Sequence, residues 1–450
     1  MSSTEFAAKR KNILERALSI FANVRHGEGT TAFLMTLNVF ILLTAYYIIK
    51  PVREALILSG AGAEIKSYAG AGQAMLFLLI VPIYSAVASR VNRIRLINGV
   101  SAFFISNLAI FYILGQMQFQ LGVVFFLWVG LFSLMVVAQF WAFANDIYTE
   151  EQGKRLFAII GIGSSLGAIF GAQVAGWLFE PIGPFSMMAV AAGLLAVCMI
   201  LTNWINYWCF ALPGSRFARQ GSATMRRSDA AQPIGTSGGF RLVLRHRYLL
   251  LIAILVLLSN FVNTTGEFIL GKTVAQHAKG LPNGEAYIGE FYAGFFLWVN
   301  LLGAALQMFA VSRIMKYLGI GPALFILPVI ALGSYTLLAF APVLSYIRVA
   351  KIAENSADYS IQSTSRHALF LKTSREAKYK AQSAIESFFW RAGDALSALL
   401  VFIGTRLAFD ISKFAITNTI LVLVWLAVAL AIVRLRKRER MAEAEIRRAA

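Results

Sequence analysis

Long apolar runs dominate this chain of 450 residues, and each is close to the ~20 residues that a helix needs to cross a bilayer. Helices on the surface of soluble proteins carry one apolar face, whereas these runs are apolar on every side. Backbone polar groups in lipid must be satisfied within the spanning structure, which favours helices. The runs are continuous rather than alternating, which argues against a β-barrel. The pattern therefore predicts an all-α polytopic membrane protein.

Twelve spans fit the pattern, divided six and six by a basic polar stretch around residues 216–247. We place them at 31–49, 67–89, 96–115, 121–144, 157–179, 184–208, 248–270, 287–312, 319–340, 343–365, 382–405 and 412–434. The predicted parts are an amphipathic cytoplasmic segment (1–29), an N-terminal six-helix bundle (30–208), a cytoplasmic linker (209–247), a C-terminal six-helix bundle (248–434) and a cytoplasmic tail (435–450). Two such bundles are typical of transporters.

The composition agrees with a membrane protein, since 58% of residues are hydrophobic and only 14% are charged. A net charge of +19 would by itself suggest a nucleic-acid partner. However, Lys and Arg gather in alternate connections and in the tails, which is the positive-inside pattern. We therefore expect no nucleic-acid partner. Both termini should be cytoplasmic, with their basic residues beside anionic lipid.

Residues for covalent or metal chemistry are scattered. Cys198 and Cys209 form no disulfide framework, and the four histidines lie far apart in the chain. No nucleophile–base pair stands out, so we expect neither an enzyme nor a cofactor.

One glycine pattern in the fifth span invites a different interpretation. Gly161, Gly163 and Gly167 resemble a dinucleotide-binding loop, but no strand precedes them. Gly163, Gly167 and Gly171 recur every four residues, followed by Ala175. The spacing predicts a stripe of small residues against which another helix packs closely.

Charges inside apolar spans are costly and usually face a cavity or a partner. Lys50 and Arg53 come at the predicted outer end of the first span, beside Glu54. They are either interfacial residues that reach toward water or an anion-binding pair at the mouth of a cavity. Pro51 and the stretch from Gly60 to Gly62 predict a broken, reoriented helix here.

The second half has charges at a corresponding place. Glu267 and Lys272 lie near the end of the seventh span, which is otherwise uncharged from Leu249 to Gly266. Charges at the first helix of each half are expected to line a shared site.

The tenth span carries the densest charge. Arg348, Lys351, Glu354, Asp358 and Arg366 interrupt it. Helical spacing joins several of its polar residues in one stripe, namely Lys351, Glu354, Asn355, Asp358 and Gln362. We expect this stripe to face the central cavity, and ion pairing between helices is the alternative.

The eleventh span has a smaller charged group. Glu386, Trp390 and Asp394 share a face at spacing four, and Arg391 can pair with Asp394 or reach Asp358. A structural salt bridge and a substrate contact both remain open.

These charges favour an anionic substrate, because guanidinium and ammonium groups suit phosphate or carboxylate. The candidate substrate-binding residues are Lys50, Arg53, Glu267, Lys272, Arg348, Lys351, Asp358 and Arg391. Nearby aromatic residues would either stack on a base or pack against lipid and helices, and they are Tyr46, Tyr47, Phe140, Trp141, Phe291 and Tyr292.

A family resemblance rests mainly on Trp141–Phe157, which reads WAFANDIYTEEQGKRLF. This stretch resembles the segment after the fourth helix in the nucleotide (ATP/ADP) transporter family, a divergent branch of the major facilitator fold. Tyr47–Leu56, the surroundings of Glu267, and Lys378–Glu386 are similar to that family as well. The resemblance implies twelve helices, Arg53 at the family's first-helix lysine and Glu267 at its seventh-helix glutamate.

Two positions depart from the family pattern. Gln139 stands at an acidic position of the fourth helix, and Gln382 at a basic position before the eleventh, with Lys380 two residues earlier. Another substrate therefore stays open.

Taken with the charges, the resemblance predicts a monomeric secondary transporter in a bacterial inner membrane. Its substrate would be a small organic anion such as a nucleotide or other phosphorylated metabolite, moved by alternating access. Arg53, Lys351 and Arg348 would hold the anion, and Glu267 and Asp358 would be charge partners or proton-coupling groups. A non-transporting sensor or scaffold, and a proton-coupled carrier of an unrelated solute, are the alternatives.

Overall fold

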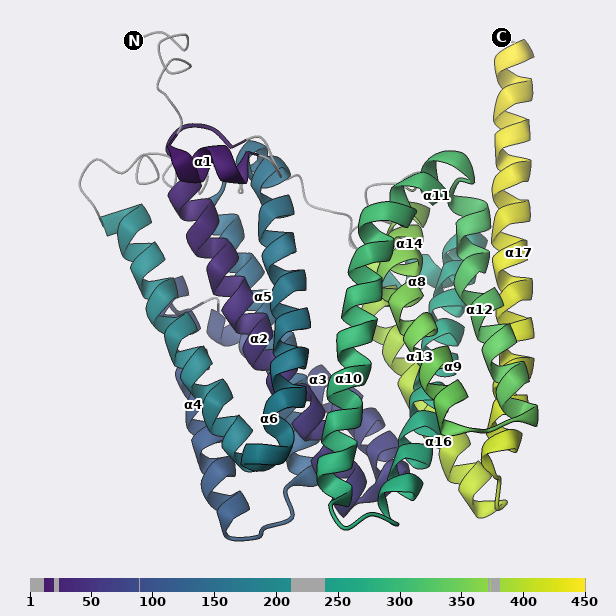
Figure 1. The fold of residues 1–450 in the computed structure, drawn as a ribbon. Coiled ribbons are helices and arrows are strands. Elements are labelled where there is room, and N and C mark those ends of the chain that lie inside the picture. The colour runs from purple at the N-terminus through teal and green to yellow at the C-terminus, as the bar shows by residue number, and fades with distance from the viewer. Residues whose placement is uncertain are drawn as a thin grey trace, which may run out of the picture. The chain divides into compact units, whose positions relative to one another are not determined.

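The computed structural model describes residues 12–19, 24–88, 90–211, 239–370, 373 and 381–449, and their regular elements are all helices (Figure 1). Most of the predicted linker, residues 212–238, lies outside the described residues, as does Lys380. The amphipathic segment is described only from residue 12 to 19 and from residue 24 onward.

The helices of the first half follow the predicted runs closely. They are α1 (Ile13–Leu18), α2 (Gly29–Gly60), α3 (Gly62–Ala88), α4 (Arg93–Gln116), α5 (Gly122–Ile147), α6 (Glu150–Asn206) and the π-helical turn η2 (Tyr207–Ala211). The start of α6 has a clear local cause. Thr149 and Gln152 form a capping box there, which satisfies backbone N–H groups that the first turn leaves open.

The second half contains more interruptions. Its helices are α8 (Gly239–Arg245), α9 (Arg247–Ala278), α10 (Gly284–Ala305), α11 (Ser312–Tyr317), α12 (Ile320–Phe340), α13 (Leu344–Ala357), α14 (Ser363–Leu369), α15 (Gln382–Ala384), α16 (Trp390–Arg406) and α17 (Ile411–Ala449). Three π-helical turns join some of them, η4 (Leu306–Val311), η5 (Asp358–Gln362) and η7 (Ile385–Phe389). Such turns often occur at functional sites.

Ten helical segments of the described chain are long and apolar enough to cross a membrane. One of them, 155–209, passes through Gly183, whose φ of 74° marks the place where the predicted fifth and sixth spans meet. Figure 1 draws α6 as two legs joined by a turn. The predicted tenth span corresponds to α13, η5 and α14 together. It is not one of the ten apolar segments, because it carries too many charged residues. The all-α polytopic class is confirmed, and the exact number of crossings stays a prediction.

The predicted break of this helix occurs in the stretch from Gly60 to Gly62 and not at Pro51. Helix α2 continues through Pro51 to Gly60, and the chain turns only at Gly62, whose φ is 88°. Proline removes one backbone donor, and helices in membranes tolerate this because neighbouring groups satisfy the freed carbonyl. Lys50 and Arg53 consequently lie within a helix and not in an outer loop. The segment between the predicted seventh and eighth spans, residues 271–286, is likewise helical as far as Ala278.

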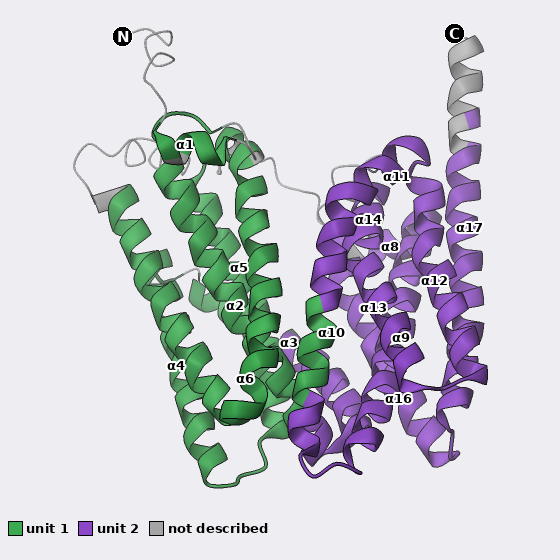
Figure 2. Cartoon of the chain, in the orientation of Figure 1, with its two compact units in different colours: residues 1–56, 78–232, 289–297 green, residues 57–77, 233–288, 298–450 purple. Residues whose placement is uncertain are grey.

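The chain forms two compact units (Figure 2). Unit 1 consists of residues 1–56, 78–232 and 289–297, and unit 2 of residues 57–77, 233–288 and 298–450. Two short pieces therefore belong with the other half of the chain, residues 57–77 with unit 2 and residues 289–297 with unit 1.

Close packing of α6 against α2 organises unit 1. Gly163, Gly167 and Gly171 each face a backbone carbonyl of α2, and a Cβ atom at Gly163 would lie 2.7 Å from the carbonyl oxygen of Thr36. Only hydrogen fits at this distance, so the stripe of small residues lets the backbones approach. The predicted packing role of these glycines is confirmed.

An ion pair fastens the beginning of α2 to the beginning of α6. The guanidinium of Arg155 donates to both carboxylate oxygens of Glu28, at 3.0 and 2.8 Å. The backbone N–H of Arg25 donates to the same carboxylate at 2.9 Å. Two-point guanidinium–carboxylate contacts fix geometry as well as charge.

Helix α9 is the centre of unit 2, in contact with α13, α16 and α17. Gly393 of α16 allows one of these contacts, since a Cβ atom there would lie 2.8 Å from the carbonyl oxygen of Leu257. Asn418 of α17 donates to the carbonyl oxygen of Val262 at 3.1 Å. The polar residues of α9 are thereby held against three neighbouring helices.

Candidate functional site

Lys50 is the most enclosed cation among the described residues of unit 1. Lys50 is 8% exposed, and its Nζ lies 4.1 Å from the ring centre of Phe296 and 5.0 Å from that of Tyr47. The ring of Tyr46 is 5.8 Å away. Aromatic faces attract a cation and keep water from it. Two of the predicted aromatic residues, Tyr46 and Tyr47, thus surround a predicted substrate-binding lysine.

Arg53 lies one turn further along α2. Its guanidinium donates to a carboxylate oxygen of the adjacent Glu54, and its Cζ lies 5.0 Å above the ring of Phe126. The Arg53 side chain is 16% exposed and the Glu54 side chain 1%. The structure therefore gives unit 1 two enclosed cations on one helix, one within aromatic rings and one beside a carboxylate.

Lys351 of α13 is the most deeply buried charge of unit 2, with no exposed surface. Its Nζ donates to Oδ1 of Asn263 at 2.8 Å and to Oε2 of Glu354 at 3.1 Å. Oε1 of Glu267 lies 3.6 Å from the same ammonium. An ammonium at this depth persists only when its hydrogens are accepted and its charge is balanced.

The carboxylates around Lys351 have further donors. The hydroxyl of Tyr335 donates to Oε2 of Glu354 at 2.9 Å, and Nδ2 of Asn355 donates to Oε1 of Glu267 at 2.9 Å. Gly266 leaves room for this network, because a Cβ atom there would lie 3.0 Å from the Lys351 ammonium. Lys351 is thus paired within α13 with Glu354 and across to α9 with Glu267, and the second pair is the ion pairing between helices that the sequence left open as an alternative.

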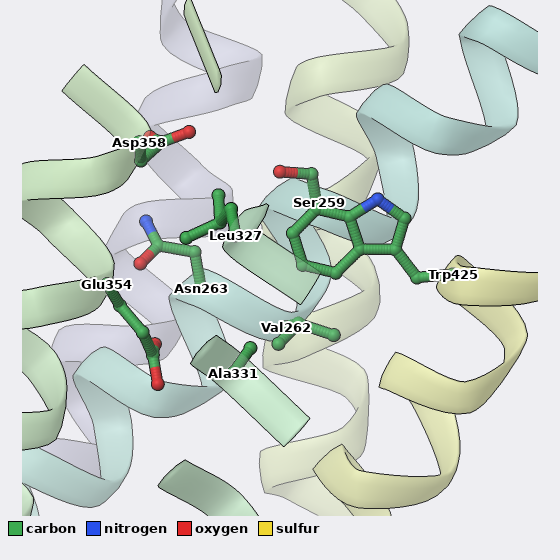
Figure 3. Close-up of a pocket in the computed structure, with 8 residues that line it drawn as sticks. All are labelled: Ser259, Val262, Asn263, Leu327, Ala331, Glu354, Asp358 and Trp425. Carbon is green, nitrogen blue, oxygen red and sulfur yellow. The ribbon is translucent and has the colours of Figure 1, made fainter. Parts of the chain in front are cut away.

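Asp358 lies one turn beyond Glu354, in the π-helical turn η5, and is 8% exposed. Its Oδ1 and the Oε1 of Glu354 are buried and have no hydrogen-bond partner among the described residues. Both residues line a small cavity within unit 2 (Figure 3). The other lining residues are Ser259, Val262, Asn263, Leu327, Ala331 and Trp425.

Lys272 lies apart from this network, although it is close to Glu267 in sequence. Its Nζ is 3.1 Å from Oε1 of Glu64 of α3, and the ring of Phe268 lies 5.4 Å away. The two charged residues of the seventh span therefore have partners on different helices. Glu267 pairs with α13, and Lys272 pairs with α3.

Arg391 makes the nearer of its two predicted pairings. It donates to Oδ2 of Asp394 at 3.2 Å and stacks 4.6 Å from the ring of Phe77. Oδ1 of Asp394 also accepts from Asn260 at 2.7 Å and from Thr264 at 2.9 Å, so this carboxylate ties α16 to α9. Arg348 is half-buried on α13, one turn before Lys351.

Several residues of the unit 2 network were not among the sequence-based candidates. Asn260 and Asn263 carried a usable signal, since they are amides within an apolar run. Tyr335 carried none, because a tyrosine in a span is ordinary and its partner Glu354 is distant in the chain. Among the described residues, no group of three or more metal-ligating side chains comes together.

Comparison with known proteins places the chain in a family. A family model described as the Major Facilitator Superfamily matches residues 30–353. The chain belongs to this superfamily. Solved transporter structures show a similar fold. A nucleoside transporter, NupG, aligns with a TM-score of 0.58 at 14% identity over 90% of this chain and 99% of its own. A bacterial homologue of the iron transporter ferroportin aligns with a TM-score of 0.60 at 13% identity, over 90% of this chain and 98% of its own.

Within the Major Facilitator Superfamily, the chain is a distant relative of ADP,ATP carrier proteins. ADP,ATP carrier protein 1 of Chlamydia muridarum is 23% identical over 335 residues, which are 65% of this chain and 61% of that protein. The chloroplastic ADP,ATP carrier protein 1 of Arabidopsis thaliana is 29% identical over 87 residues, 16% of this chain and 14% of that protein. The alignment thus spans less than two thirds of the chlamydial relative.

The two positions that depart from the carrier pattern have local partners. Gln139 is 4% exposed, and its Nε2 donates to the hydroxyl of Tyr84 at 3.0 Å. Nε2 of Gln382 donates to Oε1 of Glu386 at 2.9 Å. Each glutamine therefore donates a hydrogen bond to a nearby polar side chain.

Proposed function

We propose that this chain is a secondary transporter that moves an organic anion by alternating access, with a nucleotide as the leading substrate. The observation that carries the proposal is the enclosed Lys50 of α2, with three aromatic rings around its ammonium. A cation at membrane depth is expensive to keep, and it is usually retained for a substrate pathway. The distant relationship to ADP,ATP carrier proteins supports the choice of substrate.

Lys50 and Arg53 have the chemistry that such a substrate requires. An ammonium and a guanidinium on successive turns of one helix can contact two oxygens of a phosphate chain. The rings of Tyr46 and Tyr47 offer flat faces to a base, and stacking on such faces contributes about 1–3 kcal/mol per base in nucleic-acid complexes. The proposed role of Lys50 and Arg53 is to bind the anion while the aromatic rings orient the base.

We propose in addition an orientation of the protein in the membrane and a mode of action. Basic connections lie at the cytoplasmic face, beside anionic lipid, and both termini are cytoplasmic. The protein works as a monomer in the inner membrane and carries out no covalent chemistry.

The test is transport by purified full-length protein in liposomes. Uptake of labelled ADP is measured with and without ATP inside, and Lys50→Gln is compared with Lys50→Arg. We expect exchange in the wild type and a loss of about 10- to 100-fold in Lys50→Gln, the scale of one charge-assisted contact. Lys50→Arg should retain part of the activity.

Lys316→Gln is the matched control, since Lys316 is an exposed lysine of α11. Exchange by this variant should equal that of the wild type. If wild-type liposomes take up neither nucleotides nor simpler organic anions, the anion assignment fails. If they bind nucleotide without moving it, the protein is a sensor that has kept the transporter fold.

A further inference from the structure

The short helix α8 (Gly239–Arg245) directly precedes α9, the first long helix of the second half (Figure 1). His246 separates the two helices, because its backbone is extended, with a φ of −106° and a ψ of 111°. The chain therefore changes direction between α8 and the apolar part of α9. A short helix that leaves the axis of a membrane span in this way can lie at the boundary between lipid and water.

One side of α8 packs against the rest of unit 2. Val243 has no exposed surface, and the ring of Phe240 meets that of Phe388 edge-on, with 5.0 Å between the ring centres. Just beyond α8, the hydroxyl of Tyr248 donates to the carbonyl oxygen of Leu369 at 3.0 Å. These contacts hold α8 in place and determine which of its sides face outward.

The outward sides of α8 are apolar and cationic at adjacent positions. Leu244 is 67% exposed and Phe240 is 48% exposed. Arg241 and Arg245 are exposed as well, and their spacing of four puts them on one side of the helix. Because an α-helix turns by about 100° per residue, this cationic side lies next to the side that carries Leu244. A phospholipid has the same division, with a charged headgroup beside apolar acyl chains.

The two arginines of α8 are not used in ion pairs within the described part of the protein, where no carboxylate pairs with Arg241 or Arg245. An arginine at another turn differs in this respect, since Arg93 pairs with Asp146 at 2.6 Å. Glu386, in the turn η7 that also contains Phe388, contacts a glutamine and a histidine instead. The guanidinium groups of α8 are therefore available to a partner that carries negative charge.

We propose that α8 binds an anionic phospholipid, with Arg241 and Arg245 on the headgroup phosphate and with Phe240 and Leu244 against the acyl chains. Guanidinium groups suit phosphate because they present several donors in one plane. A lipid also covers the two apolar side chains, which a free phosphate would leave in water. The orientation proposed above puts α8 at the cytoplasmic face, where anionic lipids attract basic segments. A lipid bound there fastens the beginning of α9 to the membrane surface.

Native mass spectrometry of the purified full-length protein in detergent tests this site, because it counts bound lipids directly. The probe is phosphatidylglycerol, and the reference is phosphatidylcholine with the same acyl chains. We expect the wild type to bind one phosphatidylglycerol about tenfold more tightly than phosphatidylcholine. Arg241→Gln combined with Arg245→Gln should weaken this binding by about 30-fold, the scale of two arginine contacts with anionic lipid. Arg241→Lys combined with Arg245→Lys keeps both charges and should retain most of the binding.

The matched control removes two positive charges from another exposed helix of unit 2, with Arg313→Gln and Lys316→Gln in α11. Its binding of phosphatidylglycerol should equal that of the wild type. Equal losses in this control and in the α8 variant would mean that only the total surface charge matters, which overturns the proposal. A wild-type protein that binds the two lipids equally well overturns it too.

Leu244→Ser tests the apolar half of the site and separates a lipid from a free anion. The side chain is largely exposed, so the variant should fold, and thermal unfolding checks this. Its affinity for phosphatidylglycerol should fall by about fivefold, because less apolar surface is covered. Glycerol phosphate in large excess should not displace the lipid from the wild type. Unchanged binding by Leu244→Ser, or displacement by glycerol phosphate, would assign the site to a free anion and overturn the proposal. The measurement needs no transported substrate, so its outcome is independent of the nucleotide assignment.

Discussion

Lys351 of α13 and Glu267 of α9 are 84 positions apart in the sequence, and their charged atoms, Nζ and Oε1, lie 3.6 Å apart. The ammonium is enclosed completely, while a quarter of the Glu267 side chain is exposed, at 26%. This pair therefore connects a buried charge network with the surface of α9.

Removal of Lys351 should be strongly destabilising. Lys351→Met leaves the buried Glu354 without its cation, and breaking one side of such a pair costs about 3–5 kcal/mol. The measurement is the unfolding free energy in mixed micelles. A double variant that adds Glu354→Gln removes the orphaned charge as well and should recover part of the loss. A cost below about 1 kcal/mol for Lys351→Met would show that the pair is dispensable.

The glycine stripe of unit 1 gives a packing prediction. Gly167→Ala places a methyl group against the backbone of Phe40 and should destabilise the protein by about 1–3 kcal/mol. Gly161→Ala is the matched control on the same helix, because nothing lies within 4 Å of a Cβ atom there. It should be neutral or slightly stabilising, since alanine favours helix more than glycine. Thermal unfolding of both variants compares them directly, and equal melting temperatures would contradict close packing at Gly167.

The ion pair at the beginning of α2 predicts a dependence on pH. Burial alone would raise the pKa of Glu28, but hydrogen bonds from the Arg155 guanidinium and the Arg25 backbone lower it below its ordinary value of 4.5. A carboxyl whose pKa is depressed on folding stabilises the protein above its unfolded pKa, and this contribution is lost as the pH falls through the folded pKa.

The corresponding experiment compares Glu28→Gln with the wild type as the pH is lowered below about 4.5. At neutral pH the variant should be less stable by about 1.5–3 kcal/mol, the scale of hydrogen bonds to a charged group. The difference should shrink as acid protonates Glu28 in the wild type. A constant difference down to the lowest pH would mean that the Glu28 charge contributes nothing.

The pair between Lys272 and Glu64 should be weak. Both side chains are partly exposed, at 21% and 33%, and exposed pairs contribute about 0–1 kcal/mol. A double-mutant cycle with Lys272→Gln and Glu64→Gln measures the coupling. The exchanged pair, Lys272→Glu with Glu64→Lys, should restore most of the stability lost by Lys272→Glu alone. Failure of that rescue would show that Lys272 acts through Phe268 instead.

Hydropathy and spacing predicted the fold well where one interaction dominates. The apolar runs determined the helices, and the fourfold spacing of Gly163, Gly167 and Gly171 predicted a close helix contact that the structure contains. The i, i+3 spacing likewise predicted the Arg391–Asp394 pair as one of two choices. Each of these follows from periodicity within a single helix.

Long-range partners could not be predicted in this way. Glu267 and Lys272 are five positions apart, yet they pair with different helices because α9 presents them on different sides. Helix α2 continues through Pro51, and membrane helices tolerate proline where neighbouring groups satisfy the freed carbonyl, which local rules do not include. The burial of Lys351 depends on Gly266 and Tyr335, whose sequence contexts are ordinary.

The π-helical turn η5 changes how the tenth span should be numbered. An α-helix rotates by about 100° per residue, and a π-helical turn accommodates one additional residue, so the side chains after Gln362 are displaced by about that angle. A helical wheel drawn through Lys351 and Arg366 as one continuous helix puts them in the wrong phase. An accessibility scan by single cysteines should show its periodicity jump by one position between Ala357 and Ser363. Alignments of this span with relatives that lack the turn need a one-residue gap there.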